Sequence, residues 1–305
     1  MSIETASAKP YKAGYVALLG KPNVGKSTLL NQIVGHKVSI VSNKPQTTRR
    51  RVIGITTTTE YQIAFIDTPG IHEPHTQLGK AMVEQARMSL GDADEVVYVA
   101  DGSHHPGEQD REVAKLIKQD LKIPMILCMN KMDLLKAEDV QRNLDAFCGM
   151  LGVDNDHFML TTATRGHNVD KLVDLVVAQL PERERMYSED EFTDQSSRFL
   201  AAELVREKIL QATHAEVPHS VAVMVDDWED EPQLTRIAAT ILVEKSSQRA
   251  ILIGKQGQFL KKIGTEARLE IEEIVGHKVF LQLHVKVSED WRMSPRILHE
   301  LEYSD

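Results

Sequence analysis

The 305-residue sequence has few cysteines, no long apolar run and no excess of positive charge. Its two cysteines, Cys128 and Cys148, lie in an apolar run and a helical pattern, and no second pair accompanies them to suggest a zinc cluster. Its 12 histidines lack the spacing of metal ligands. No stretch approaches the roughly 18 consecutive apolar residues of a membrane-spanning helix. The net charge of -9 argues against nucleic-acid binding over the whole surface, but it does not exclude a local basic patch.

The N-terminus, MSIETASAKP, lacks the basic, apolar and small-residue segments of a signal peptide. We therefore expect a cytoplasmic location, or at most a peripheral one on the cytoplasmic face of a membrane. With 42% hydrophobic and 27% charged residues, the composition is that of a globular protein and excludes wholesale disorder. A chain of this length is expected to hold two compact domains of about 150 residues each.

Short apolar runs alternate with helical patterns between residues 15 and 180. This order predicts parallel strands joined by crossover helices, as in a doubly wound α/β domain, which we assign to residues 12–181. The runs are Tyr15–Leu19, Val52–Thr57, Ile63–Ile66, Glu95–Ala100, Pro124–Met129 and His157–Leu160, and the helical patterns cover about 27–34, 79–90, 107–120, 138–150 and 168–180.

Residues 182–197 carry many charges and few aliphatic side chains, which is typical of a solvated linker. Beyond it, the order of patterns is α-β-β-α-α-β, which predicts a small α+β domain over residues 198–305. Its elements are a helix at about 198–213, strands at His219–Val225 and Arg236–Val243, helices on either side of 254–257, a strand at Lys278–Val287 and a terminal helix from about Glu289.

The segment GKPNVGKS, residues 20–27, directly follows an apolar strand and directly precedes a helical pattern. It matches G-x-x-x-x-G-K-[ST], a loop whose backbone N–H groups turn toward phosphates. Lys26 can reach the β- and γ-phosphates, and Ser27 can ligate Mg²⁺. We predict that this loop binds a nucleotide through Gly20, Lys21, Pro22, Asn23, Val24, Gly25, Lys26, Ser27 and Thr28.

The motif DTPG, residues 67–70, ends a second apolar run. Asp67 can hold Mg²⁺ directly or through water, and the Gly70 amide can meet the γ-phosphate. The predicted contacts of this motif are Asp67, Thr68, Pro69 and Gly70.

The motif NKMD, residues 130–133, ends the strand at Pro124–Met129. Asp133 can accept hydrogen bonds from both N1–H and the exocyclic amine of guanine, a donor pair that adenine does not present on that edge. Asn130 contacts the base or braces the neighbouring loop. A further amide can meet the guanine oxygen from the next strand end. The predicted base contacts are Asn130, Lys131, Asp133, Thr161, Thr162 and Ala163.

The polar segment GHKVSIVSNKPQTTRRR lies between the first helix and the strand at Val52–Thr57. A threonine here can bind Mg²⁺ in the presence of the γ-phosphate and release it after hydrolysis, which would make the segment a switch. Thr47 and Thr48 are the candidates, and we prefer Thr48; the alternative is a solvated polar loop. The predicted metal ligands are thus Ser27, Thr48 and Asp67.

GKPNVGKS, PQTTR, DTPG, NKMD and TTA occur in this order and resemble the Era/TrmE branch of bacterial GTPases over about residues 12–300. The resemblance implies hydrolysis of GTP to GDP by an in-line water. Ile71 follows DTPG, where many signalling GTPases have a water-orienting glutamine, so we expect slow intrinsic turnover. Relatives with asparagine at the position of Asn23 use K⁺ in place of an arginine finger, so the resemblance adds K⁺ as a candidate ion. The expected catalytic residues are Lys26, Thr48 and Asn23.

The tetrad GKQG, residues 254–257, joins two helical patterns and matches the G-x-x-G loop by which KH modules clamp a nucleic-acid backbone. Residues 245–262 hold five basic residues and no acidic one, which is typical of a phosphate-binding face. The alternative is a helix-joining turn beside a solvated lysine face. The predicted RNA contacts are Gly254, Lys255, Gln256, Gly257, Lys261 and Lys262.

The α-β-β-α-α-β order resembles a type II KH fold and narrows the resemblance to the Era family. In that family the KH module binds 16S ribosomal RNA near its 3′ end, and the protein acts in assembly of the small ribosomal subunit. The resemblance therefore implies GTP/GDP, Mg²⁺, 16S ribosomal RNA and a precursor of the small subunit as partners. Two alternatives stay open: a GTPase partner in transfer-RNA modification, and a membrane-associated signalling GTPase with an incidental basic loop.

Overall fold

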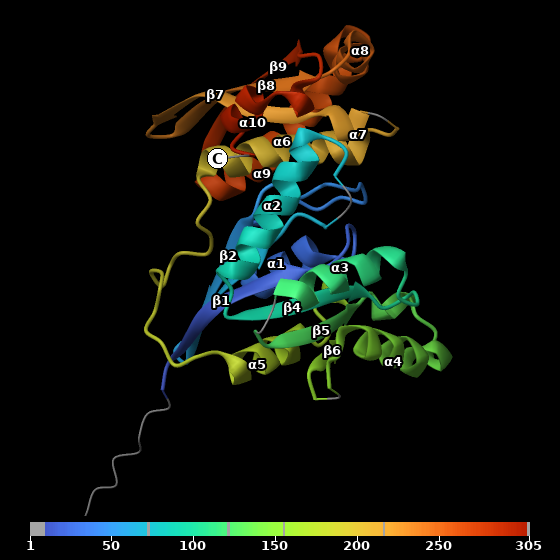
Figure 1. Ribbon diagram of the computed structural model, residues 1–305. Helices are drawn as coiled ribbons and strands as arrows, with labels where there is room; N and C mark the ends of the chain where they lie inside the picture. The colour runs from blue at the N-terminus through green and yellow to red at the C-terminus, as the bar shows by residue number, and fades with distance from the viewer. Residues whose placement is uncertain (1–9, 72–73, 121–122, 155, 216, 304–305) are drawn as a thin grey trace, which may run out of the picture.

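The computed structural model describes residues 10–71, 74–120, 123–154, 156–215 and 217–303. They form two domains that lie one above the other and contact each other (Figure 1). The first contains a sheet with strand order β2-β3-β1-β4-β5-β6. Its elements are β1 (Lys12–Leu19), α1 (Lys26–Val34), β2 (Val52–Thr57), β3 (Tyr61–Asp67), α2 (Gln77–Gly91), β4 (Glu95–Asp101), α3 (Glu108–Asp120), β5 (Met125–Asn130), α4 (Val140–Leu151), β6 (Phe158–Leu160) and α5 (Val169–Gln179).

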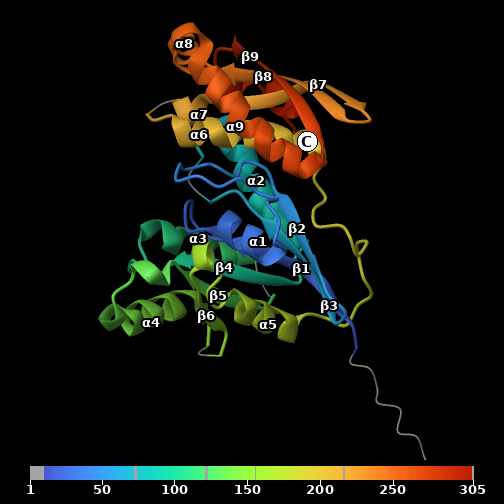
Figure 2. The same cartoon turned by 180° about the vertical axis from the view of Figure 1, so that it is seen from behind.

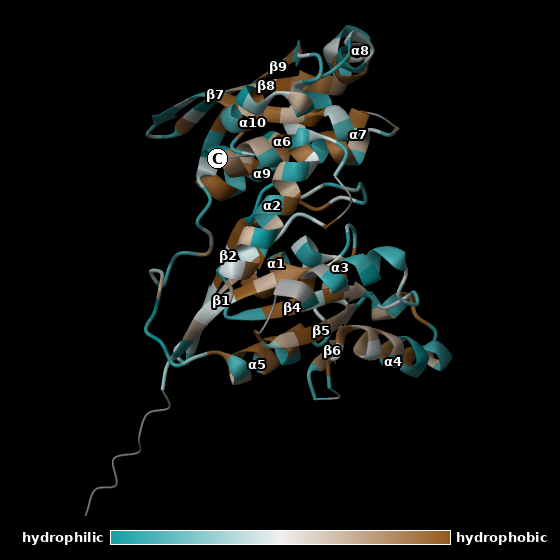
Figure 3. Ribbon diagram, viewed as in Figure 1, coloured by the Kyte–Doolittle hydropathy of each residue, from teal (hydrophilic) through white to brown (hydrophobic). Residues whose placement is uncertain are grey.

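The first sheet is covered on both faces because successive side chains of a strand point to opposite sides. In β1, Val16 and Leu18 pack with α1 and α5, whereas Ala17 and Leu19 pack toward α2, α3 and α4. All positions of the central strand β4 are buried. Figure 3 shows the brown hydrophobic strands of this sheet between helices with teal hydrophilic surfaces. The predicted doubly wound P-loop domain is confirmed.

One expectation about this sheet is wrong: β2 and β3 do not join through a crossover helix. They pair antiparallel, with Val52 opposite Asp67 and Thr57 opposite Gln62. The connection between Thr57 and Tyr61 is too short for a parallel crossover, which needs about a dozen residues or more. β2 is therefore the outer strand of a hairpin at the edge of an otherwise parallel sheet.

The second domain has an antiparallel pair, β7 and β8, with β9 parallel to β8. Its elements are α6 (Ser197–Ala212), α7 (Val217–Ser220), β7 (Ala222–Glu231), β8 (Leu234–Val243), α8 (Ser246–Ile253), α9 (Gln258–Val275), β9 (Lys278–Val287) and α10 (Pro295–Glu300). Helices α6 and α9 pack on the sheet around a core that includes Ile209, Ile241 and Ile263. The predicted KH-type fold is confirmed.

Two element boundaries in this domain differ from the expected ones. The strand expected at His219–Val225 begins only at Ala222, because His219 and Ser220 belong to α7, and it continues through the acidic run to Glu231. Apart from Trp228, which packs against the core, the residues of that extension are exposed, so its pairing with β8 and not a hydrophobic pattern defines it. The terminal helix starts at Pro295, capped by Ser294.

The segment between the domains, expected to be a solvated linker, packs against the first domain. The Ile55 N–H donates to the carbonyl of Phe192, and the Thr193 hydroxyl donates to the carbonyl of Ile53. These bonds cover part of the exposed edge of β2. Figures 1 and 2 show this segment running along the side of the first sheet. The charged side chains of this segment gave no sign of the packing, because one of these bonds joins two backbone groups and the other joins a hydroxyl to a backbone carbonyl.

The domains also share an apolar cluster. Leu78 and Met82 of α2 pack with Trp291, Leu242 and Leu298 of the second domain. The two domains are thus joined by packing as well as by the chain. In the part of the chain that the structure describes, every helix falls short of the length and hydrophobicity that crossing a membrane requires.

Glu95 is the first residue of β4 in the first sheet and is 1% exposed. Neither oxygen of its carboxylate has a hydrogen-bond partner among the described residues. Burial raises the pKa of Glu95 to about 8, and the charge of Lys12 only partly opposes this. The folded domain therefore favours the protonated acid at neutral pH.

We expect Glu95→Gln to become more stable relative to wild type as the pH rises. Above about pH 4.5 the unfolded chain loses this proton while the folded chain keeps it up to about pH 8, so wild-type stability falls by up to about 1.4 kcal/mol per pH unit. Urea unfolding at pH 6 and pH 8.5 is expected to show a relative gain of about 2 kcal/mol for Glu95→Gln. The exposed Glu112, changed to Gln, is the control. An unchanged difference between the two pH values would contradict a raised pKa.

Candidate functional site

A cleft opens at the carboxyl ends of the first-domain strands, where ligands bind in open α/β sheets. It brings together several of the predicted nucleotide contacts: Pro22, Asn23, Gly25, Lys26, Ser27, Thr28, Thr48, Gly70, Asn130, Lys131, Asp133 and Ala163. Other predicted residues lie outside its lining: Gly20, Lys21, Val24, Asp67, Thr68, Pro69, Thr161 and Thr162. Several of these are buried directly beneath, Asp67, Thr68 and Thr161 among them.

The lining also includes Thr47, the less preferred of the two candidate threonines, and residues that sequence analysis did not select: Ile40, Val41, Ser42, Asn43, Gln46, Leu134 and Thr164. Most belong to the polar segment that precedes β2. Within that segment only the two threonines had a side chain that predicted a role, because the other residues line the cleft through their place in the loop and not through a characteristic side chain. The sequence indicated these other residues only by their position in the same loop as Thr48.

The loop before α1 depends on Gly25. Its φ is +100°, and a Cβ at this position would lie 2.4 Å from the Nδ2 of Asn130. A side chain is thus excluded both by strain and by space. The following N–H groups open α1 and, at a helix start, lack intrahelical partners, which makes them suitable for an anion.

Lys26 lies in this loop, only 6% exposed. Its ammonium donates to the carbonyls of Gly20 and Lys21 at 3.1 Å each. Burial lowers the pKa of Lys26 to about 8, although the Asp67 carboxylate opposes the shift. A bound phosphate would favour the charged ammonium.

The three predicted metal ligands converge on one buried carboxylate. The Ser27 hydroxyl lies 2.6 Å from Oδ2 of Asp67 and 2.9 Å from the Thr48 hydroxyl, and Thr48 lies 3.4 Å from the same carboxylate oxygen. Burial raises the pKa of Asp67 despite the Lys26 charge and these hydroxyl donors. Its other oxygen, Oδ1, is buried without a hydrogen-bond partner among the described residues.

These groups fit Mg²⁺, which prefers oxygen ligands and is often bound by one carboxylate together with phosphates. The oxygens that could bind the ion are the unpartnered Oδ1 of Asp67 and the hydroxyls of Ser27 and Thr48. Thr47 is placed differently: its hydroxyl bonds the Lys44 carbonyl at 2.6 Å and the Ser42 hydroxyl at 2.8 Å. The geometry therefore favours Thr48 over Thr47.

At the other end of the cleft, Asn130 braces loops. Its Nδ2 donates to the Val24 carbonyl at 2.9 Å, and its Oδ1 accepts the Ala163 N–H at 2.9 Å. Asp133 faces the cleft, 3.6 Å from the guanidinium of Arg165, a residue that sequence analysis missed. Lys131 adopts a left-handed conformation and pairs with Asp101 at 2.8 Å.

A second groove runs along α9 and β9 in the second domain. Of the predicted RNA contacts, Gly257 and Lys261 line it, together with unpredicted Leu260, Gly264, Thr265, Arg268 and Leu281–Leu283. Gly254, Lys255, Gln256 and Lys262 lie outside the lining; Lys255, Gln256 and Lys262 are exposed beside it. The positions 257, 261, 264 and 268 follow helical spacing, which was the available signal for Arg268.

Comparison with known proteins gives the same division of the chain. Residues 15–131 match the family model of the 50S ribosome-binding GTPase, and residues 216–292 match that of the KH domain. The chain is 42% identical to GTPase Era of Heliobacterium modesticaldum, over 96% of this chain and 98% of that protein. It is 44% identical to GTPase Era of Leuconostoc citreum, over 97% of each.

Two solved structures resemble the molecule over nearly its whole length. The crystal structure of Era in complex with MgGDPNP and nucleotides 1506–1542 of 16S ribosomal RNA has a TM-score of 0.93 and 41% identity, covering 97% of this chain and 100% of that one. The crystal structure of a single-residue variant of Aquifex aeolicus Era bound to GDP·AlF4⁻ has a TM-score of 0.92 and 41% identity, covering 96% and 100%.

Proposed function

Because the chain belongs to the GTPase Era family, we propose that it binds 16S ribosomal RNA near the 3′ end through its KH domain and acts in assembly of the small ribosomal subunit while it hydrolyses GTP. The observation that carries the proposal is the match of both domains to a relative crystallised with a 16S ribosomal RNA fragment. The match to Era proteins over the KH domain argues against a GTPase of transfer-RNA modification. The cytoplasm is the proposed location because ribosomal precursors are found there.

The first-domain cleft is the proposed GTP site. Mg²⁺, when bound, neutralises charge on the β- and γ-phosphates, and Ser27, Thr48 and Asp67 would hold it, Asp67 directly or through water. Lys26 exchanges its two carbonyl partners for the phosphates. The attacking water forms a bond to the γ-phosphorus as the bond to the GDP oxygen breaks, and GDP leaves with the electron pair. No water-orienting side chain is supplied at Ile71, which is 6% exposed and packs in the core.

Asp133 is the proposed guanine-reading residue because its carboxylate faces the cleft beyond the Asn130 brace. We expect Asp133→Asn to reverse one hydrogen-bond partner, so that GTP affinity falls at least about 100-fold and xanthosine triphosphate affinity rises. Competition binding with fluorescent nucleotides measures both. The exposed Asp145, changed to Asn, is the control. Undiminished GTP affinity of Asp133→Asn would remove the assignment.

K⁺ is the proposed second ion, next to Asn23. This asparagine has φ +64° and donates to the carbonyl of Asn43, so it joins the phosphate loop to the loop before β2. We expect faster hydrolysis in K⁺ than in Na⁺ at equal ionic strength, and loss of the difference in Asn23→Ala. Equal rates in the two salts would contradict the K⁺ proposal and would mean that another group supplies the positive charge that an arginine finger provides in other GTPases.

The groove beside Gly257 is the proposed RNA site. Gly257 has φ +75°, and a Cβ there would meet nothing within 4 Å, so the position is open toward solvent. Lys255, Lys261 and Lys262 are exposed around it, and they attract a phosphate backbone.

We expect Gly257→Asp to weaken RNA binding more than about tenfold by placing a negative charge among these lysines. Gly257→Asn is the matched control, since it imposes similar backbone strain without charge. GTP binding should survive in both variants, and the salt dependence of RNA binding should flatten in Lys261→Ala/Lys262→Ala. Filter binding with a 16S 3′-end fragment measures these affinities. Equal binding by folded Gly257→Asp and wild type would identify the tetrad as a helix-joining turn only.

Peripheral membrane contact remains a separate prediction from the sequence. The proposed function does not require it. Sedimentation with anionic lipid vesicles in the absence of RNA would test it, with co-sedimentation as the supporting result.

A further inference from the structure

The loop that carries Thr48 is held from outside the GTPase domain. It runs from the end of α1 to the start of β2, between residues 35 and 51. Its inner side lines the nucleotide cleft through Val41, Ser42 and Gln46–Thr48. Its outer side faces α6 of the KH domain, more than 150 residues later in the sequence.

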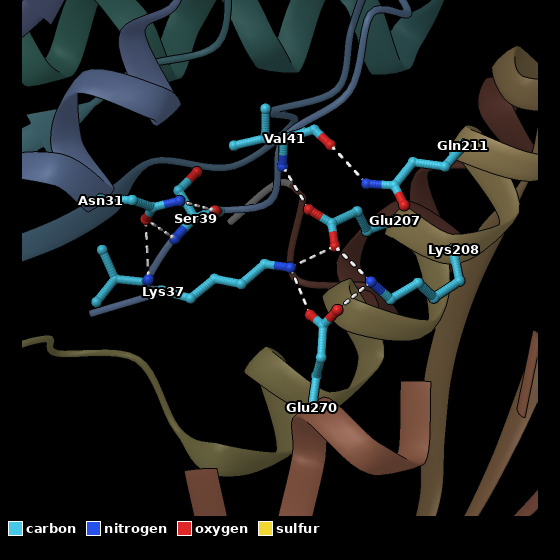
Figure 4. Close-up of polar contacts among 9 residues, drawn as sticks. Asn31, Lys37, Ser39, Val41, Glu207, Lys208, Gln211 and Glu270 are labelled. Carbon is cyan, nitrogen blue, oxygen red and sulfur yellow. Dashed lines mark hydrogen bonds and ion pairs between the residues drawn. The ribbon is translucent and has the colours of Figure 1, made fainter. Parts of the chain in front are cut away.

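One turn of α6 contacts both ends of the segment 41–47. At the first end, Glu207 accepts the Val41 N–H at 2.7 Å, and Gln211 donates to the Val41 carbonyl at 3.2 Å. Glu207 and Gln211 are four residues apart and share one face of the helix, so together they bind both polar groups of a single peptide residue. Figure 4 shows these two side chains converging on Val41.

At the second end, the guanidinium of Arg206 donates to the carbonyl of Thr47, the residue directly before Thr48. Arg206 is fully buried and is paired within its own helix to Glu203. Burial opposes its charge, but Glu203, Tyr303 and Glu207 together outweigh burial, and the pKa of Arg206 is raised. This donor is therefore charged and fixed at every relevant pH.

Glu207 is fixed by charge as well. Its side chain is 1% exposed and is paired with Lys37 at 2.5 Å and Lys208 at 3.3 Å. Both lysines also pair with Glu270 of α9, so the carboxylate belongs to a closed network between the domains (Figure 4). A buried carboxylate with such partners keeps one position, which makes its bond to Val41 a fixed reference point.

The residue after Thr48 is anchored to the same domain. Arg49 is 1% exposed and donates to the carbonyls of Val221, His219 and Pro218 at 2.6, 3.3 and 3.4 Å. Its guanidinium also lies 5.6 Å from the Trp291 ring. The residues on both sides of Thr48 are thus tied to the KH domain, Thr47 through its carbonyl and Arg49 through its side chain.

We propose that α6 of the KH domain positions Thr48 for GTP hydrolysis: Glu207 and Gln211 hold Val41, Arg206 holds Thr47, and the closed loop presents the Thr48 hydroxyl to Ser27 and Asp67. Arg206, Glu207 and Gln211 are positioning residues, since none of them touches the nucleotide cleft. The physical basis is entropy: ordering a loop residue costs conformational entropy, and the contacts to α6 meet that cost before GTP binds. The inference rests on the proposed role of Thr48 as a Mg²⁺ ligand.

The test measures the Mg²⁺ concentration that half-saturates binding of a non-hydrolysable GTP analogue to the full chain, together with kcat and GDP affinity. We expect Glu207→Ala/Gln211→Ala to raise this Mg²⁺ requirement about tenfold, since both hydrogen bonds that hold Val41 are lost. GDP affinity should change less than twofold, because Thr48 acts only with the γ-phosphate. Glu207→Gln keeps an oxygen acceptor for the Val41 N–H, so its Mg²⁺ requirement should stay close to that of the wild type. Arg198→Ala, at an exposed position of the same helix, is the matched control.

A double-mutant cycle ties the effect to Thr48. Thr48→Ala alone should raise the Mg²⁺ requirement, and adding Glu207→Ala/Gln211→Ala should raise it less than twofold further. Gln211 is exposed and its substitution leaves the buried network intact, so Gln211→Ala alone should raise the requirement about threefold even if Glu207→Ala does not fold.

The outcomes separate the two levels of the hypothesis. If Thr48→Ala leaves the Mg²⁺ requirement unchanged, the proposed metal role of Thr48 is wrong and the inference falls with it. If Thr48→Ala raises it but Gln211→Ala and the double variant do not, the inference alone is overturned. Equal losses of GDP and GTP-analogue affinity, or the same losses in Arg198→Ala, would also overturn it, because they indicate a general loss of structure.

Discussion

The Asp67 carboxylate, buried at the carboxyl end of β3, is the point on which the GTPase site depends. One of its oxygens accepts hydrogen bonds from the hydroxyls of Ser27, Ser39 and Thr48. The start of α1, the loop before β2 and the end of β3 therefore meet at a single atom. The other oxygen has no partner among the described residues, although burial makes such an atom costly. That oxygen suits a cation bound together with a phosphate. The phosphate loop, the loop carrying Thr48 and the end of β3 all meet at this carboxylate.

The arrangement extends beyond the domain that contains the nucleotide motifs. The loop carrying Thr48 is packed between the cleft and α6, and its fixed points include Val41, Thr47 and Arg49. Helix α6 also packs on α9, the helix that begins directly after residues 254–257, and shares the Glu270 ion pairs with it. The loop that lines the nucleotide cleft and the proposed RNA groove therefore both contact this helix pair. This contact, and not the connecting segment, relates the two sites in space.

The elements that were predicted correctly from the sequence have a strong local signal. β9 has the expected bounds because its alternation of exposed and partly buried positions matches the strand period. The wrong expectations share a different cause. The antiparallel β2, the extension of β7 to Glu231 and the packed segment near Phe192 are defined by backbone hydrogen bonds to neighbouring strands. Such bonds use groups that every residue carries, so side-chain patterns do not report them.

The sequence by itself determined the family to which the order of the motifs belongs, and it supplied the residues predicted to bind phosphate, Mg²⁺ and guanine. Those properties reside in residue types and short spacings, as in GKPNVGKS and NKMD. Only the tertiary structure decided that Asn130 braces loops, that Thr48 and not Thr47 faces Asp67, and that Arg206 and Glu207 hold the loop. Contacts between residues more than 150 positions apart are created by packing, because no local pattern encodes which buried charges will meet.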